Sequence, residues 1–126
     1  MTTADLTSKS KVTTGNDSIV IMRNLGDIPG GRTLDVTGFA PDVISAGHVI
    51  IKETSSGEFK PMPVNGSAYD ALPSGHTYEG VLVASIEKSK PFAAIMDRGD
   101  VLEPASPYPP TSAIKTALSL IKFKTE

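Results

Sequence analysis

The stretch TYEGVLVASI, residues 77–86, is rich in apolar and β-branched residues and predicts the strongest strand of the chain. A turn at residues 89–91 follows, then the apolar segment FAAIM at residues 92–96 and a second turn expected at Asp97, Arg98 and Gly99. A short helix and a closing strand near Phe123 complete this region. This order predicts a mainly β fold, a small β-barrel or sandwich with one short C-terminal helix.

The segments on either side extend the same pattern. Strands are expected at residues 19–22, 32–36 and 48–52, and a return strand at 58–62. Pro61 and Pro63 cannot donate to a sheet ladder, so the return strand is expected either to be an edge or to end early. Thr111 or Ser112 is expected to cap a helix that runs to about residue 119. Its apolar face would carry Ile114, Ala117 and Leu118.

A length of 126 residues suits one domain. Residues 1–17 are rich in Thr, Ser, Lys and Asn, with little apolar surface to offset the entropy of ordering. We therefore divide the chain into an extended, flexible N-terminal arm, residues 1–17, and a β-rich domain, residues 18–126. On composition alone, the arm is either a functional element or a leader without a role.

Charge and composition narrow the classes of partner. The net charge of -2 does not favour nucleic-acid binding, which usually needs a basic excess. The chain has no cysteine, so disulfides and thiol chemistry are excluded. No apolar run approaches the length of a membrane span, and the first residues lack a signal-peptide core. The expectation is a protein with neither nucleic acid nor membrane as partner, and the absence of cysteine is compatible with a reducing compartment.

Reactive side chains are few. His48 and His76 are the only histidines, and neither lies in a catalytic motif or in a close-spaced ligand pair. His48 is expected to be a partly exposed strand residue. Asp97 and Asp100 are interpreted as turn aspartates, and the tripeptide Arg98-Gly99-Asp100 as a turn rather than an adhesion motif. The sequence therefore predicts no enzyme, no metal site and no cofactor.

Several segments together resemble a known family. They are AGHVI at residues 46–50, GVL at 80–82, IMDRGDV at 95–101 and ALSLIKF at 117–123. In this order, after a polar arm, they resemble the capsid decoration proteins of tailed bacteriophages, which have the lambda-type head decoration fold. The resemblance covers residues 18–124, although residues 61–75 match nothing in it.

The resemblance implies a virion structural protein on the capsid exterior that cements an icosahedral shell. Its implied partners are the major capsid protein and two further copies of the chain, as a homotrimer. It also implies that the arm orders on docking and adds backbone hydrogen bonds to an edge strand of the coat protein. The capsid-binding residues expected on this basis are Thr7, Ser8, Lys9, Ser10, Lys11, Val12, Thr13 and Thr14.

Two further hypotheses remain open. Pro107, Tyr108 and Pro109 form a stiff run with one aromatic, which suits either a subunit interface or a plain linker into the helix. The alternative function is a small carbohydrate- or ligand-binding β-module of a larger surface complex. The absence of tryptophan and the presence of only three tyrosines weigh against a sugar site.

Overall fold

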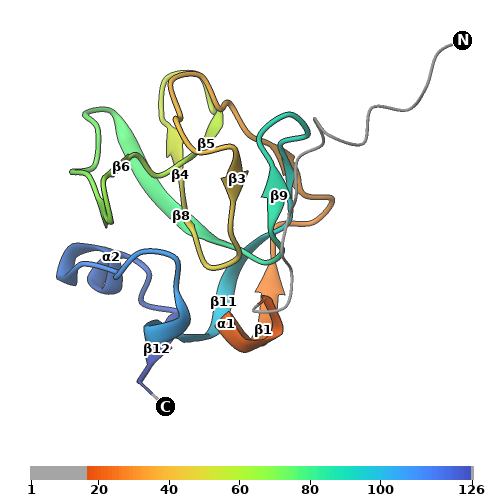
Figure 1. Cartoon of the computed structure of the whole chain (residues 1–126), viewed down its shortest axis with the longest axis vertical. Helices are drawn as coiled ribbons and strands as arrows, with labels where there is room; N and C mark the ends of the chain where they lie inside the picture. The colour runs from red at the N-terminus through yellow and green to blue at the C-terminus, as the bar shows by residue number, and fades with distance from the viewer. Residues whose placement is uncertain (1–16, 126) are drawn as a thin grey trace, which may run out of the picture.

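The computed structural model describes residues 17–125, and its main feature is one six-stranded sheet. Five strands follow the order β1-β11-β8-β4-β5, and β12 pairs with β11 in parallel (Figure 1). Their bounds are Ile21–Asp27 for β1, Val49–Glu53 for β4, Phe59–Pro61 for β5, His76–Leu82 for β8, Ile95–Leu102 for β11 and Ile121–Lys124 for β12.

Three short two-stranded ladders flank this sheet. They pair β2 with β10, β3 with β9, and β6 with β7. Their bounds are Arg32–Thr33 for β2, Val43–Ile44 for β3, Val64–Asn65 for β6, Ala68–Tyr69 for β7, Ile86–Glu87 for β9 and Phe92–Ala93 for β10. The mainly β fold with one short C-terminal helix is thus confirmed. The sheets are open rather than closed into a barrel, because β1 and β5 are the two ends of the main sheet.

The C-terminal helix α2 spans Ser112–Ala117, two residues shorter than expected, and its predicted cap is confirmed. The Thr111 hydroxyl accepts the backbone N–H of Ile114 at 3.3 Å, satisfying an otherwise unpaired donor of the first turn. A four-residue helical turn, α1, spans Asp17–Val20, and a 3₁₀ turn, η1, spans Glu103–Ala105. The strand expected at residues 19–22 therefore begins only at Ile21, after α1.

The central strands are buried on both faces, which explains why their sequences are continuously apolar rather than alternating. Successive residues point to opposite faces, so Val81 enters one core cluster and Leu82 the other. The first cluster lies beneath α2 and includes Val49, Ile51, Met96, Val101, Ile114, Leu118 and Ile121. The second includes Leu34, Phe39, Ile44, Ile50, Ala93 and Ile95.

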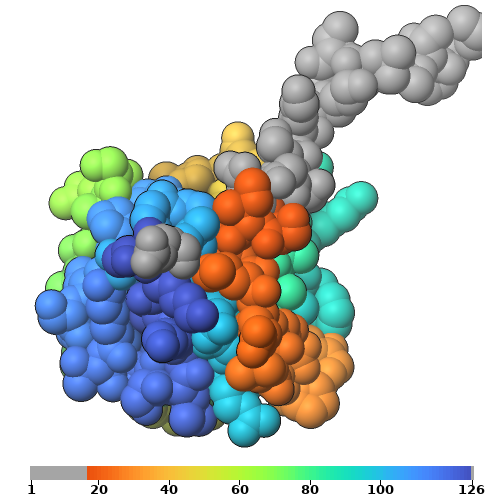
Figure 2. All heavy atoms as spheres, turned by 90° about the horizontal axis from the view of Figure 1, so that it is seen from below, coloured from red at the N-terminus to blue at the C-terminus, as the bar shows by residue number. Residues whose placement is uncertain are grey.

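The turn expected at Asp97, Arg98 and Gly99 is wrong, because β11 runs through it without interruption. Strands on both sides hold it extended: Gly99 lies opposite Asn24 of β1 and Ile121 of β12. Figure 2 shows the strip formed by α1 and β1 beside the C-terminal segment on one face of the molecule. The edge position predicted for the strand containing Pro61 is confirmed.

Candidate binding surfaces

The eight residues expected to bind a capsid, Thr7 to Thr14, lie outside the described residues. The structure does describe the point where they join the domain. The Asp17 carboxylate accepts hydrogen bonds from the Ser85 backbone N–H at 2.8 Å and from the Ser85 hydroxyl at 2.7 Å. The same hydroxyl accepts the Ala46 N–H at 3.0 Å. Asp17, the last residue of the expected arm, is therefore tied to the folded domain.

Packing holds the same junction from the other side. Val20, the last residue of α1, is buried, and its Cγ1 atom lies 2.5 Å from the position a Cβ would take on Gly47. Gly47 also has φ of +90°, a backbone conformation that side-chain-bearing residues rarely adopt. The chain preceding residue 17 thus joins the domain at a group of residues that we call the arm root: Asp17, Val20, Gly47 and Ser85.

The segment Pro107–Tyr108–Pro109, expected to form either an interface or a linker, is only partly available on the surface. Pro109 is exposed, whereas Pro107 and Tyr108 are half-buried. The Tyr108 ring packs against His48 and Tyr69, with centroid distances of 5.5 Å and 5.2 Å. Tyr108 therefore has an intramolecular packing role, and the subunit interface at this segment stays a prediction.

His48 is buried at 1% exposure, so the expectation of a partly exposed strand residue is wrong. Its Nε2 atom lies 2.9 Å from the Met62 carbonyl oxygen, which can only accept, so Nε2 carries the proton. Rings of Phe39, Tyr69 and Tyr108 surround it edge-on. Burial lowers the pKa of His48 to about 4, against the smaller opposing effect of the Met62 bond.

Tyr69 completes this cluster through the backbone. Its hydroxyl accepts the Val49 N–H at 3.0 Å. Burial raises the pKa of the phenol above its ordinary value. A neutral imidazole and a neutral phenol, each bonded to the main chain, are structural groups and not the parts of an acid–base pair. No local pattern in the sequence predicts this cluster, because its four rings come from separate segments of the chain.

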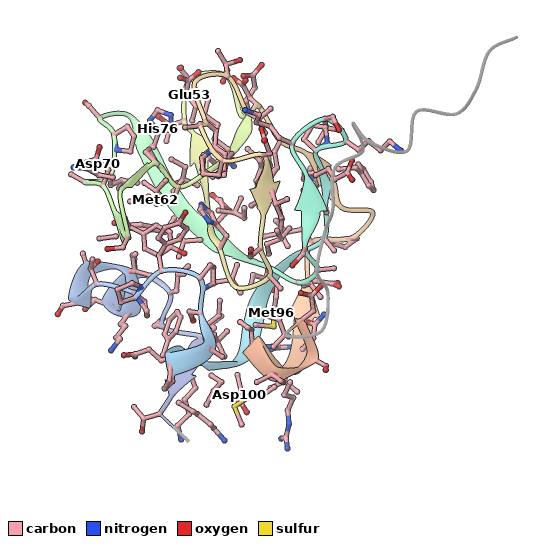
Figure 3. The ribbon with its side chains drawn as sticks, viewed as in Figure 1. Glu53, Met62, Asp70, His76, Met96 and Asp100 are labelled. Carbon is pink, nitrogen blue, oxygen red and sulfur yellow. The ribbon has the colours of Figure 1, made fainter. Side chains whose placement is uncertain are left out.

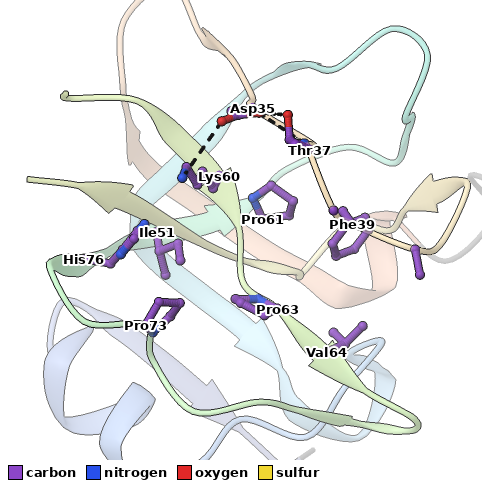
Figure 4. A pocket seen from close by; sticks show the side chains of 12 residues that line it. Asp35, Thr37, Phe39, Ile51, Lys60, Pro61, Pro63, Val64, Pro73 and His76 are labelled. Atoms are coloured by element: carbon purple, nitrogen blue, oxygen red, sulfur yellow. Dashed lines mark hydrogen bonds and ion pairs between the residues drawn. The ribbon is translucent and has the colours of Figure 1, made fainter.

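One pocket of about 300 Å³ opens at the far end of the sheet from β12. Its walls include Phe39, Ile51, Pro61, Pro63 and Pro73 (Figure 4). This size is at the lower end of the range for small-ligand sites.

The charged groups at the rim of the pocket are engaged with one another. Lys60 lies 3.9 Å from the Asp35 carboxylate and 3.5 Å from that of Glu53. Asp35 also accepts the Thr37 hydroxyl at 2.7 Å and the Thr37 N–H at 3.1 Å. The two bonds from Thr37 are the main cause that holds the pKa of the Asp35 carboxyl below its ordinary value, and Glu58 and Lys60 make smaller contributions in the same direction. Asp35, Thr37 and Lys60 are thus paired with one another or with Glu53, and none of them is left free to orient a ligand in the pocket.

Ionisable side chains are dispersed over the described part of the chain. In Figure 3, Glu53 and His76 lie together at one end and Asp100 at the opposite end. Among residues 17–125, no three His, Asp or Glu side chains gather as a metal site requires. No helix in this range is long and apolar enough to cross a bilayer.

The tripeptide Arg98-Gly99-Asp100 lies inside β11 rather than on an exposed turn. Asp100 pairs with Lys124 at 3.6 Å. A Cβ on Gly99 would overlap the carbonyl oxygen of Arg23 on the neighbouring strand. Close approach of two strands therefore explains this glycine, and the turn aspartates assigned from the sequence are corrected to strand residues.

Comparison with known proteins adds no relative: no protein-family model, curated protein or solved structure matches the chain.

Proposed function

We propose that this chain is a virion structural protein that binds the outside of an icosahedral capsid and stabilises it. Residues 7–14 would add as a strand to an edge of the major capsid protein, and three copies of the chain would dock together as a homotrimer. Strand addition draws its affinity from main-chain hydrogen bonds and so tolerates a polar sequence. Three linked arms raise the effective concentration of each contact. Binding only the assembled shell stabilises that shell by mass action.

The observation that carries this proposal is the arm root. A polar stretch of 16 residues is joined to the domain at Asp17, which two short hydrogen bonds tie to Ser85. The contact between the arm and the coat protein would hold the domain on the capsid only if the arm is firmly attached to the domain. The root connects directly to β1, the edge of the main sheet.

The segments behind the family resemblance also support the proposal. Residues 46–50 lead into β4, residues 80–82 end β8, residues 95–101 form most of β11, and residues 117–123 link α2 to β12. These strands are direct neighbours in the main sheet. The segments that carry the resemblance thus lie in neighbouring strands of one sheet rather than in separate turns.

The test is co-pelleting with expanded, undecorated shells assembled from the coat protein encoded in the same genome. Full-length protein should pellet saturably, and a variant lacking residues 1–16 should remain in the supernatant. Val12→Pro removes one backbone donor from the middle of the arm, whereas Val12→Ser keeps it. If the backbone makes the contact, Val12→Pro should bind at least about tenfold more weakly and Val12→Ser nearly normally.

Thermal unfolding of the shortened variant provides the control, since the domain should melt as it does in the full-length chain. Full-affinity binding by the shortened variant would refute the arm mechanism. Absence of any binding by the full-length protein would refute the capsid function itself.

A ligand-binding β-module remains the second candidate because of the 300 Å³ pocket near Pro61, Pro63 and Pro73. Its mutually paired rim charges offer little to orient a polar ligand. A saccharide that raised the melting temperature of the wild type but not of a Pro63→Trp variant would favour this function over capsid decoration.

A further inference from the structure

Large apolar side chains are exposed on α1 and on β1, the edge strand of the main sheet that follows it. Of the five exposed large hydrophobic residues among those described, three lie within seven positions: Ile19, Met22 and Leu25, at 49%, 44% and 54% exposure. We call them the β1 patch. Exposed apolar residues are ordinary singly, but a group of them marks a contact surface.

The local geometry of β1 brings these side chains to the surface. The register against β11 slips between Ile21 and Arg23 and again between Asn24 and Gly26, which places Met22 and Leu25 in β-bulges. Bulges re-aim side chains at sheet edges. Edge strands that only need protection against aggregation usually carry charges or proline at such positions. Here the two bulged residues are Met and Leu, which points to a contact made by side chains.

The outer edge of β1 is uncovered within the described part of the chain. Its single strand partner there is β11, and five of its seven residues are exposed. Leu120 is also exposed, at 66%, and lies on the other side of β11, where its carbonyl oxygen accepts the Gly99 N–H at 3.2 Å. Figure 2 shows the α1 and β1 strip and the C-terminal segment side by side on this face.

The length of chain between the arm and the patch restricts what can cover it. Only three residue steps separate Thr14, the last proposed arm contact, from Asp17, a span of at most about 10 Å when extended. Asp17 itself is fixed to Ser85, and Ile19 follows two residues later. A surface that binds residues 7–14 is therefore held beside the β1 patch.

We infer that the β1 patch is a second capsid contact, an apolar surface that seats on the coat protein next to the strand captured by the arm. This inference rests on the proposed capsid function and adds to it a specific surface of the folded domain. The arm would supply backbone hydrogen bonds, and the patch would supply burial of apolar area. Because both contacts are linked through the arm root, their effects on affinity should multiply.

The test compares the wild type with the double variant Met22→Thr/Leu25→Thr, which keeps strand-compatible side chains and removes two of the three apolar side chains of the β1 patch. Phe92→Thr is the matched control, because Phe92 is equally exposed, at 61%, but lies on β10. In co-pelleting with the same coat-protein shells, the double variant should bind about tenfold more weakly or worse. Phe92→Thr should bind as the wild type does.

Sedimentation velocity without shells separates this inference from a contact between copies of the chain. The inference requires the double variant to keep the wild-type oligomeric state and melting temperature while losing shell affinity. Dissociation of the double variant into smaller species would assign the patch to a subunit interface and overturn the inference. Unchanged shell binding, or equal loss with Phe92→Thr, would also overturn it. Wild-type protein that fails to bind shells would instead refute the underlying capsid function.

Discussion

Protonation of His48 should govern how the stability of the domain falls in mild acid. The imidazole is enclosed by three aromatic rings, and its Nε2–H donates to the Met62 carbonyl. Its pKa of about 4 in the folded protein lies below the ordinary 6.5. Between pH 6.5 and 4, His48 is therefore protonated in the unfolded chain but not in the folded chain. Stability is fully present above pH 6.5 and falls as the pH is lowered through this window.

The size of the effect follows from the two pKa values. Linkage gives a loss of about 2 kcal/mol at pH 5 and about 3 kcal/mol at pH 4, relative to neutral pH. Below about pH 4 the folded state also binds the proton, and this contribution levels off. A loss of this size is a large fraction of the stability of a typical small domain.

The assay is urea unfolding of the wild type and of His48→Gln at pH 7.5, 6, 5 and 4. Gln cannot titrate, and its amide can still donate toward Met62. His48→Gln should be less stable than the wild type at pH 7.5, and the difference should shrink by about 2 kcal/mol at pH 5. His76→Gln is the control, since it removes an imidazole and leaves that of His48 in place, and its stability should still fall in mild acid. Parallel stability curves for wild type and His48→Gln would refute the reasoning.

Two further predictions concern backbone positions. Gly99→Ala would place a Cβ against the carbonyl oxygen of Arg23 and should lower the free energy of unfolding by about 1–3 kcal/mol. Gly26→Ala is the control and should lower it clearly less, because the atom nearest to the new Cβ would lie 3.5 Å away. Equal losses for the two variants in chemical denaturation would contradict the steric argument. Thr111→Ala removes the cap of α2 and should lower the free energy of unfolding by about 1 kcal/mol, whereas Thr111→Ser keeps the hydroxyl and should lower it little. An equal loss for the two variants in chemical denaturation would show that the hydroxyl bond to Ile114 is not the cause.

The elements that sequence reasoning located were those with a local signal. Thr111 predicts the start of α2, because a capping hydroxyl bonds a backbone N–H only three residues ahead. Pro61 predicts an edge strand, because proline has no backbone N–H to donate to a neighbouring strand. Both features depend on neighbours in the chain. The strong strand at residues 77–86 was likewise evident from composition, although β8 begins at His76 and ends at Leu82.

The features that sequence reasoning missed depend on partners distant in the chain. Asp97, Arg98 and Gly99 have turn composition, yet flanking strands from both ends of the chain hold them extended. His48 looked exposed because its apolar neighbours, Phe39, Tyr69 and Tyr108, are brought in by other segments. The β1 patch was also missed, because residues 19–22 look like a buried strand until β1 is placed at an edge.

The placement of the arm root gives the proposed capsid function a mechanical basis. Tension on residues 1–16 would reach the domain at Asp17 and pass to Ser85 and to the antiparallel pairing of β1 with β11. β11 in turn pairs with β8 and β12, which connects β1 to the rest of the main sheet. A contact between the β1 patch and the coat protein would lie next to the arm root and would reduce the tension on the hydrogen bonds between Asp17 and Ser85. An arm that joins the domain through Asp17, directly before α1 and the edge strand β1, would suit the proposed attachment to a capsid.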